Sequence, residues 1–389
     1  MTSGHLNILD FTLKSLLRRK SKNAGLVFVF TFIIFISASI LFLVYSFKHE
    51  ALLILKGAPE LILQKMVAGR HELTPVSVAD EVVQMPGVSG ATPRYWGYYY
   101  DGVVKANYTI MASSDKTGEP NRLLKGRLPG RDDSREAAVG RGVAKAWFLD
   151  IDSEIVLQSA SGSPMTFRIV GIFEADSELL TSDLIVISPR DIKKLFLMPD
   201  GAATDIVVSV ANETEAPVVA RKIRDRFPDM RPILRSEIIR TYDAVFGWRS
   251  GLILTMFSGA LVAFFILAWD KATGLSADEK KEIGILKAIG WETSDILEMK
   301  FWEGLVISLT SFLLGVILAY AHVFFFGASF FGPALKGWSV IYPEFRLTPF
   351  INTYQIATLL TLTVIPYIAA TIIPSWKAAI TDPDEIVRG

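Results

Sequence analysis

The sequence of 389 residues has no cysteine, only four histidines and no net charge, because 40 lysine and arginine residues balance 40 aspartate and glutamate residues. The absence of cysteine excludes disulfide bonds, thiolate metal sites and cysteine nucleophiles. The neutral balance removes the strongly basic face that is typical of nucleic-acid-binding proteins, so no nucleic-acid partner is expected. With so few histidines, we predict no catalytic residues and no metal ligands.

A phosphate-binding loop is also absent. No segment matches G-x-x-x-x-G-K-[ST], the pattern whose backbone N–H groups and lysine hold the phosphates of ATP. The chain is therefore predicted to be a non-catalytic protein that binds no cofactor of its own.

Long hydrophobic runs, in contrast, are present, and 51% of the residues are hydrophobic. A bilayer core of about 30 Å needs a helix of about 20 apolar residues, and four runs satisfy this requirement. The expected fold is an α-helical membrane protein with four transmembrane helices and a large mixed α/β extracytoplasmic domain inserted between the first and second helices.

Lysine and arginine residues near the ends of these runs predict their orientation, since short cytoplasmic loops are enriched in both residues. Five precede the first run, from Lys14 to Lys22, whereas the loop 327–346 carries only Lys336 and Arg346. Both termini are thus predicted to be cytoplasmic. The expected segments are a cytoplasmic N-terminal segment (1–24), helix 1 (25–47), a periplasmic core domain (48–246), helix 2 (247–269), a cytoplasmic coupling segment (270–302), helix 3 (303–326), an outer loop (327–351), helix 4 (352–375) and a cytoplasmic tail (376–389).

The large domain reads as short β-rich runs separated by amphipathic helices. Helices are predicted at 76–84 and 216–227, and glycine and proline residues concentrate between about 116 and 203. This middle part is interpreted as a subdomain inserted into a β-α-β frame formed by the flanks. The predicted strands are 61–67, 97–100, 108–112, 154–158, 166–173, 184–187 and 205–210.

An aromatic stretch in this domain has two interpretations. The rings of Tyr95, Trp96, Tyr98 and Tyr100 pack within a strand, with alternate rings buried, or they form an external surface for a partner or an apolar cargo.

The segment 278–290, between the second and third runs, is a predicted amphipathic helix. Ile283, Leu286 and Ile289 are expected on one stripe, Gly290 suits the residue that ends a helix, and Thr293 or Ser294 is expected to cap the next one. From the pattern alone, the helix lies on lipid, packs on a neighbouring helix, or docks on another protein.

The residues Glu282-Ile-Gly-Ile-Leu-Lys-Ala-Ile-Gly290 resemble the signature of ABC-transporter permeases of the MacB/FtsX/LolC type. The C-terminal Pro374-Ser-Trp376-Lys-Ala-Ala and the external Arg135-Glu136-Ala-Ala-Val139-Gly140 are similar to further parts of that family. The resemblance implies that the segment is a coupling helix that contacts an ATPase. Its predicted coupling residues are Glu279, Lys280, Glu282, Ile283, Gly284, Leu286, Lys287, Ile289 and Gly290.

The resemblance also implies a function. The chain is expected to be a permease subunit in a bacterial inner membrane, paired with a second permease chain, identical or homologous, and with two copies of an ATPase that binds ATP and Mg. Lipoprotein release or export of amphiphilic cargo is the expected task, with a chaperone, an adaptor or a hydrolase as a candidate periplasmic partner. The alternatives are an FtsX-like relay that activates a cell-wall hydrolase without transport, and a membrane-anchored sensor or binding module.

Four small residues, Gly304, Ser308, Ser311 and Gly315, recur along the third hydrophobic run. Small side chains allow close helix approach within a membrane. The pattern predicts an interface, either within the bundle or between two chains.

Overall fold

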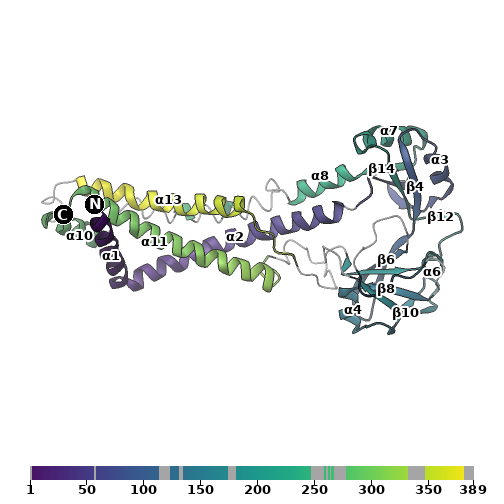
Figure 1. Ribbon diagram of the computed structural model, residues 1–389, viewed down its shortest axis with the longest axis horizontal. Coiled ribbons are helices and arrows are strands. Elements are labelled where there is room, and N and C mark those ends of the chain that lie inside the picture. The colour runs from purple at the N-terminus through teal and green to yellow at the C-terminus, as the bar shows by residue number, and fades with distance from the viewer. Residues whose placement is uncertain are drawn as a thin grey trace. The chain divides into compact units, whose positions relative to one another are not determined.

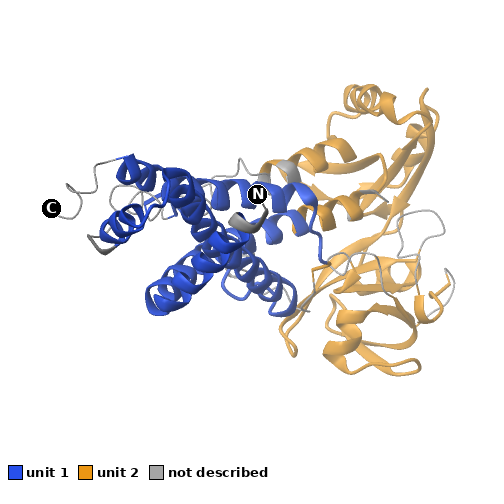
Figure 2. Cartoon of the chain, turned by 60° about the vertical axis from the view of Figure 1, so that its left-hand side comes forward, with its two compact units in different colours: residues 1–46, 247–331, 349–389 blue, residues 47–246, 332–348 orange. Residues whose placement is uncertain are grey.

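The chain divides into two compact units in the computed structural model (Figure 2). Unit 1 comprises 1–46, 247–331 and 349–389, and unit 2 comprises 47–246 and 332–348. Most of the predicted second membrane helix, 247–269, lies outside the residues that the structure describes. Those residues are 2–56, 58–113, 123–130, 135–173, 181–246, 258, 259, 262, 264–266, 277–331 and 347–380.

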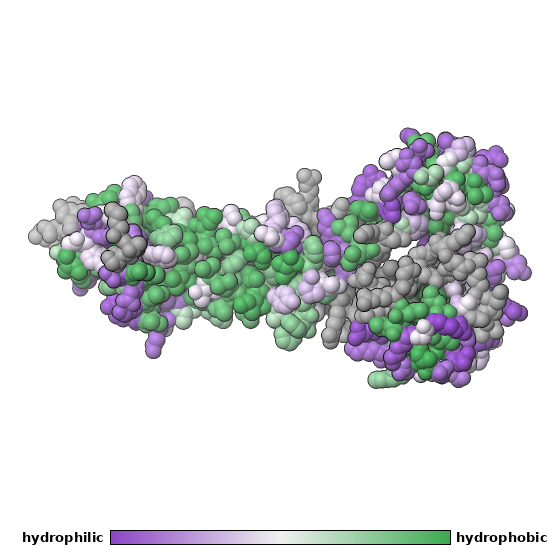
Figure 3. Space-filling model, viewed as in Figure 1, coloured by the Kyte–Doolittle hydropathy of each residue, from purple (hydrophilic) through white to green (hydrophobic). Residues whose placement is uncertain are grey.

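Three long helices run through unit 1: α2 (Lys20–Lys56), α11 (Thr293–Tyr320) and α13 (Thr353–Ile380) (Figure 1). A π-helical turn, Ala321–Phe325, continues α11. Within the described ranges these three elements are long and apolar enough to cross a membrane, and hydrophobic residues cover them in Figure 3. They contain the predicted helices 25–47, 303–326 and 352–375 apart from one residue at an end. Unit 1 also contains two shorter helices, α1 (Thr2–Arg18) and α10 (Ala277–Ala288).

The small residues of α11 pack inside this bundle. A Cβ atom on Gly304 would lie 2.6 Å from Thr371 Oγ1 of α13, and one on Gly315 would lie 2.7 Å from Ile34 Cγ2 of α2. Both distances are shorter than the van der Waals contact of a Cβ atom with another carbon or oxygen atom. Glycine is therefore required at both residues for the backbones to approach this closely. Of the two predicted interfaces, the small residues therefore form the one within the bundle.

Unit 2 is built on two sheets. In the first, the strand order is β14-β1-β13-β4, and every neighbouring pair is antiparallel. Helix α3 (Ser77–Val82) connects β1 to β4, and α7 (Ala216–Arg226) connects β13 to β14. This is a split β-α-β arrangement, in agreement with the predicted frame. The strands are β1 (Leu61–Val67), β4 (Val88–Arg94), β13 (Asp205–Val210) and β14 (Met230–Leu234), with β2 (Arg70–Glu72) on β1 and a separate pair of β3 (Thr74–Pro75) with β12 (Ala202–Ala203).

The second sheet has the order β5-β6-β11-β8-β10-β7, with β9 paired to β10. Its apolar core includes Tyr108, Phe167 and Ile185, none of which is exposed. The chain leaves the second sheet toward the first after α6 (Pro189–Leu195), and α8 (Arg235–Phe246) follows β14. The remaining elements are β5 (Trp96–Asp101), β6 (Ala106–Ala112), β7 (Leu123–Gly126), β8 (Glu136–Gly140), α4 (Arg141–Trp147), β9 (Glu154–Gln158), β10 (Pro164–Phe173) and β11 (Leu184–Ile187).

The predicted start of the inserted subdomain, at about 116, is wrong. The second sheet begins at Trp96, because β5 pairs with β6 and β6 pairs in parallel with β11. Glycine and proline residues suggested the later boundary, but they mark loops within the subdomain rather than its edge. The insertion therefore separates β4 from β13, which are neighbours in the first sheet.

The two chain segments that connect the sheets meet at a buried carboxylate. Asp205, which is fully buried, accepts hydrogen bonds from Arg94 Nε at 2.8 Å, Arg94 Nη2 at 2.7 Å and Trp96 Nε1 at 2.9 Å. Thr204 adds a hydrogen bond from its Oγ1 to the carbonyl of Trp96 at 2.7 Å. A buried charge needs such partners, so the entry and exit of the inserted subdomain are held together.

We expect Gly315→Ala to lower the free energy of unfolding by about 1–3 kcal/mol, because the added methyl group overpacks the contact with Ile34. The matched control is Gly25→Ala, since a Cβ atom there meets nothing within 4 Å. Alanine in a helix is more favourable than glycine by roughly 0.5–1 kcal/mol, so the control should keep or raise stability. Thermal unfolding in detergent measures both, and equal midpoints for the two variants would contradict the packing described.

Candidate functional site

Helix α10 carries the predicted coupling residues and ends as its sequence predicts. Gly290 has a φ of +100°, in the left-handed region that favours glycine. Its N–H donates to the carbonyl of Lys287 at 3.0 Å, and the N–H of Trp291 donates to that of Leu286 at 3.0 Å. These two bonds form a Schellman motif, which satisfies carbonyls at the helix end. The prediction that Gly290 ends the helix is confirmed.

The start of α11 differs from the prediction. Glu292, rather than Thr293 or Ser294, is the N-cap residue, with extended backbone angles of −78° and 160°. A capping box joins it to Asp295, whose Oδ2 accepts the N–H of Glu292 at 3.0 Å. The two carboxylates satisfy helix-start donors reciprocally, and this pairing fixes the start one residue earlier than a hydroxyl cap would.

The expected single stripe on α10 is wrong. Ile283 and Leu286 are buried, whereas Ile289 is 68% exposed. At about 100° per residue, Ile289 lies about 120° around the helix from Ile283 but only about 40° from Ile285. Two apolar faces are therefore present: an inner one with Ile283 and Leu286, and an outer one with Ile285 and Ile289.

The inner face binds α10 to the ends of two long helices. Ile283, Ile296 of α11 and Ala379 of α13 form one buried apolar cluster. Lys287 Nζ donates to the carbonyl of Ala379 at 2.6 Å, where the last carbonyls of α13 lack intrahelical partners. A lysine at a helix C-terminus is also favoured by the helix dipole. Helix α10 thus contacts α11 and α13 at the same point.

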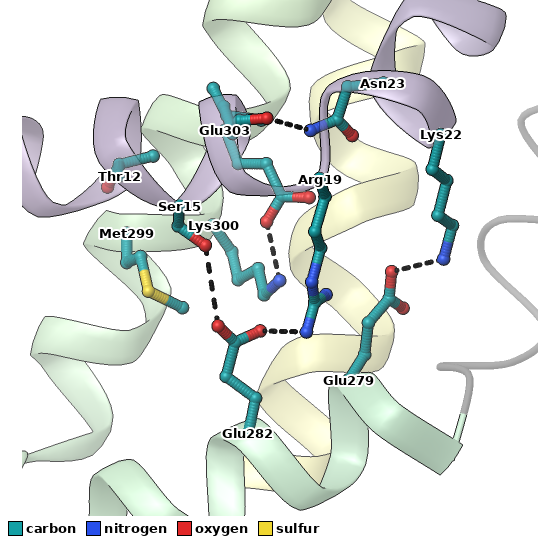
Figure 4. Close-up of a pocket in the computed structure, with 11 residues that line it drawn as sticks. Thr12, Ser15, Arg19, Lys22, Asn23, Glu279, Glu282, Met299, Lys300 and Glu303 are labelled. Carbon is teal, nitrogen blue, oxygen red and sulfur yellow. Dashed lines mark hydrogen bonds and ion pairs between the residues drawn. The ribbon is translucent and has the colours of Figure 1, made fainter.

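Two carboxylates bind α10 to the N-terminal part of the chain (Figure 4). Glu279, whose side chain is 4% exposed, pairs with Lys22 Nζ at 3.1 Å. Glu282 pairs with Arg19 Nη2 at 3.0 Å and with Arg18 Nη2 at 3.5 Å. These five residues are called the charged junction below. The basic residues, which at first predicted only orientation, therefore also neutralise the acidic residues of α10.

The pocket beside the charged junction is too small for a ligand. Its volume is ≈ 10 Å³, which is room for about one water molecule. Lys300 and Glu303 close it with an ion pair of 2.6 Å. Within the described ranges no group of three or more histidine, aspartate or glutamate residues is placed to hold a metal ion. The arrangement is a joint between helices, and its pocket has no room for a small-molecule ligand.

Helix α1 is a part of this joint that the sequence analysis missed. His5 Nδ1 lies 2.7 Å from Glu298 Oε1 of α11, and the ring of Phe11 lies 5.1 Å from the ring of Trp291. The acidic residues of α10 and the basic residues of the N-terminal segment were the signal that could have predicted this contact. The sequence does not say which helices are neighbours, so it did not predict that these residues pair.

The outer face of α10 remains exposed in the described structure. Ile285 is 52% exposed and Ile289 68%, and Lys280 and Lys281 are exposed beside them. Gly284, another predicted coupling residue, is buried. Of the nine predicted coupling residues, the inner ones hold α10 in place, and only the outer ones are accessible to another protein.

The aromatic strand β5 divides its rings between two faces. Tyr95 packs against the core of the second sheet, and the hydroxyl oxygen of Tyr99 accepts the N–H of Gln158 at 2.9 Å. On the other face, Tyr98 and Tyr100 are 72% and 62% exposed, and Trp96 contacts Tyr98 edge to face at 5.3 Å. Partial burial of alternate rings and an exposed aromatic surface are therefore both present.

Comparison with known families covers both units. Residues 24–226 match the MacB-like periplasmic core domain, and residues 253–383 match the FtsX-like permease C-terminal domain. The chain belongs to the MacB/FtsX type of ABC transporter permeases. The resemblance seen in the sequence is thus confirmed, and with it the membrane-protein class and a mixed α/β domain of the MacB kind.

Individual relatives of this permease are distant. An uncharacterized ABC transporter permease from Methanocaldococcus jannaschii is 25% identical over 268 residues, which are 61% of this chain and 64% of the relative. The periplasmic region of MacB from Actinobacillus actinomycetemcomitans is 16% identical, covering 48% of this chain and 94% of that one, with a TM-score of 0.36. The extracellular domain of YknZ, described as a noncanonic ABC-type transporter from Gram-positive bacteria, is 11% identical, covering 44% and 98%, with a TM-score of 0.31.

A double-mutant cycle tests the charged junction of the permease. We expect Arg19→Ala and Glu282→Ala to show an interaction energy of about 0.5–2 kcal/mol, because the two side chains are only 31% and 16% exposed. Denaturant unfolding in detergent micelles of the two single variants and the double variant measures this energy.

The matched control is the pair of Lys14 and Asp10, which are 73% and 62% exposed on α1. Its cycle should give about 0.5 kcal/mol or less, as exposed helix pairs do. An Arg19–Glu282 interaction no larger than the control would show that the ion pair does not fix α10.

Proposed function

We propose that this permease is the membrane subunit of an ABC system in which a separate ATPase docks on the outer face of α10. The observation that carries the proposal is the division of α10 into two faces. Its inner face contacts α11 and α13 through Ile283 and Lys287, and its outer face exposes apolar side chains to solvent. A force applied to the outer face therefore reaches both long helices directly.

The proposed docking surface is smaller than the sequence suggested. It consists of Ile285, Ile289 and Gly290, with Lys280 and Lys281 at its margin. Exposed apolar residues beside charges are typical of a helix that docks in a groove, where the charges set the register. Glu279, Glu282 and Leu286 are assigned to the support of α10 instead, since they are buried or paired within the chain.

The same proposal includes the rest of the assembly. ATP and Mg are bound by the ATPase, present in two copies, and a second permease chain completes a dimer. The α10 end faces the cytoplasm, and unit 2 lies outside a bacterial inner membrane. The fourth helix is supplied by 247–269. This orientation is supported by the distribution of lysine and arginine, because five basic residues precede the apolar run 25–47, and three of them pair with acidic residues of α10.

The proposed task is movement of unit 2 in response to ATP, for release of lipoproteins or export of amphiphilic cargo. The exposed rings of Tyr98 and Tyr100, with Trp96 beside them, are the proposed contact for a cargo or a periplasmic partner. Aromatic residues are enriched where proteins bind partners, since each buries a large apolar area and keeps a polar end.

The docking surface is tested with Ile285→Asp/Ile289→Asp. Burial of one isoleucine contributes about 1.5–3 kcal/mol, and about 1.4 kcal/mol corresponds to a tenfold change in affinity. We therefore expect the double variant to bind the partner ATPase at least tenfold more weakly and to lose the stimulation of ATP turnover. Binding is measured in detergent micelles with the purified ATPase.

The control variant is Val103→Asp/Val156→Asp, which places the same two charges on unit 2 at residues that are 84% and 53% exposed. It should bind the ATPase like the wild type. Size-exclusion chromatography checks that both double variants remain folded. Unchanged affinity in a folded Ile285→Asp/Ile289→Asp variant would refute docking at α10.

A further inference from the structure

Unit 2 has a surface feature that takes no part in the proposed coupling to an ATPase. A groove of ≈ 840 Å³ lies where the chain passes between the two sheets, lined by the ends of β4 and β6, by α6 and by the segment after α6. Sites for small molecules have volumes of about 300–1,000 Å³, so this groove has the size of a ligand site. It lies entirely within unit 2.

One part of the lining is apolar. Pro93, Tyr95, Leu197 and Met198 contribute to it. Leu197 is 58% exposed although its backbone has a φ of +52°, a conformation that is uncommon for leucine. An exposed leucine held in this way adds to the apolar surface that the groove offers a ligand.

The other part of the lining is positively charged. Arg190, Lys193 and Lys194 line the groove, with Asp200 as the opposing charge. Arg94 also lines it, but its guanidinium is bound by buried Asp205. Among the described residues no ion pair involves the three cations of α6. Lys193 Nζ lies 4.9 Å above the ring of Tyr95, which places an ammonium group directly over the apolar part.

The helix dipole accounts for the two lysines of α6 but not for Arg190. A helix dipole favours lysine in the last turn, where Lys193 and Lys194 lie, but it disfavours a cation in the first turn, where Arg190 lies. What the three residues share is the groove. An excess of cations beside an apolar surface has the complementary chemistry of a molecule with an anionic head and an apolar chain.

We propose that this groove binds one anionic amphiphile, with a phosphate or carboxylate head at Arg190, Lys193 and Lys194. Its apolar chain lies along Tyr95, Leu197 and Met198. The charge attracts the head, and burial of the chain adds affinity in proportion to the apolar area covered. The site belongs to unit 2 alone, so it does not depend on the proposed docking of an ATPase.

The experiment uses the full chain in nanodiscs of zwitterionic phosphatidylcholine, without any ATPase. Octyl phosphate is titrated by calorimetry, and the heat of empty nanodiscs is subtracted. Arg190→Gln/Lys193→Gln/Lys194→Gln should weaken binding at least tenfold. The matched control, Arg221→Gln/Lys222→Gln/Arg224→Gln, removes three exposed cations from α7 and should leave the affinity unchanged.

Two further probes distinguish the two parts of the ligand. Inorganic phosphate has the charge without the chain, and octyl glucoside has the chain without the charge. Each should bind at least tenfold more weakly than octyl phosphate. Leu197→Gly removes an apolar side chain at a residue with a positive φ, so it should keep the thermal midpoint while reducing the preference for octyl over butyl phosphate.

Four results would each overturn the proposal. Equal affinity of the α6 variant and the wild type would exclude these cations. Inorganic phosphate binding as tightly as octyl phosphate would indicate a site for free anions, and octyl glucoside doing so would indicate apolar partition alone. Displacement of octyl phosphate by hexaglutamate, at a lower hexaglutamate concentration than octyl phosphate needs to occupy the site, would indicate a site for acidic peptides.

Discussion

The burial of Ile283 against Ile296 and Ala379 is the contact on which the α10 end of unit 1 depends. One side chain joins three helices, and the neighbouring Lys287 binds the carbonyl of Ala379. Because protein interiors are close-packed and transmit strain, α10 cannot shift without moving the ends of α11 and α13. In the proposed function, a force on the outer face of α10 therefore reaches both long helices through packed side chains.

The charged junction adds the end of α1 and the start of α2 to the same contact. Glu282 is next to Ile283 in α10, and Glu279 lies about one turn before it, so the acidic and apolar contacts of α10 lie side by side. An ion pair that is only partly exposed is screened less than a surface pair, and its geometry specifies which helix face meets which.

Much of the fold was predictable, and two of the three errors share a physical cause. The bounds of β1, β9, β11 and β13 agree with the sequence analysis, because β-rich runs between turn residues are local signals. The sequence also predicted the three described long helices and the end of α10 at Gly290. The errors at Ile289 and at the start of the inserted subdomain depend on which partner packs against the residue, and a periodic pattern does not name that partner. The cap of α11 is different, because it is a local capping box of Glu292 and Asp295.

The insertion between β4 and β13 has a consequence for how unit 2 folds. Arg94 and Asp205 are paired in the first sheet but are separated by about 110 residues, and closing a flexible loop of that length costs about 4 kcal/mol in chain entropy. A folded second sheet removes most of this cost, since it already brings its own two ends together. We therefore expect the second sheet to form before the first sheet during synthesis. A substitution in the first sheet, which forms later, is then tolerated while the second sheet is still assembling.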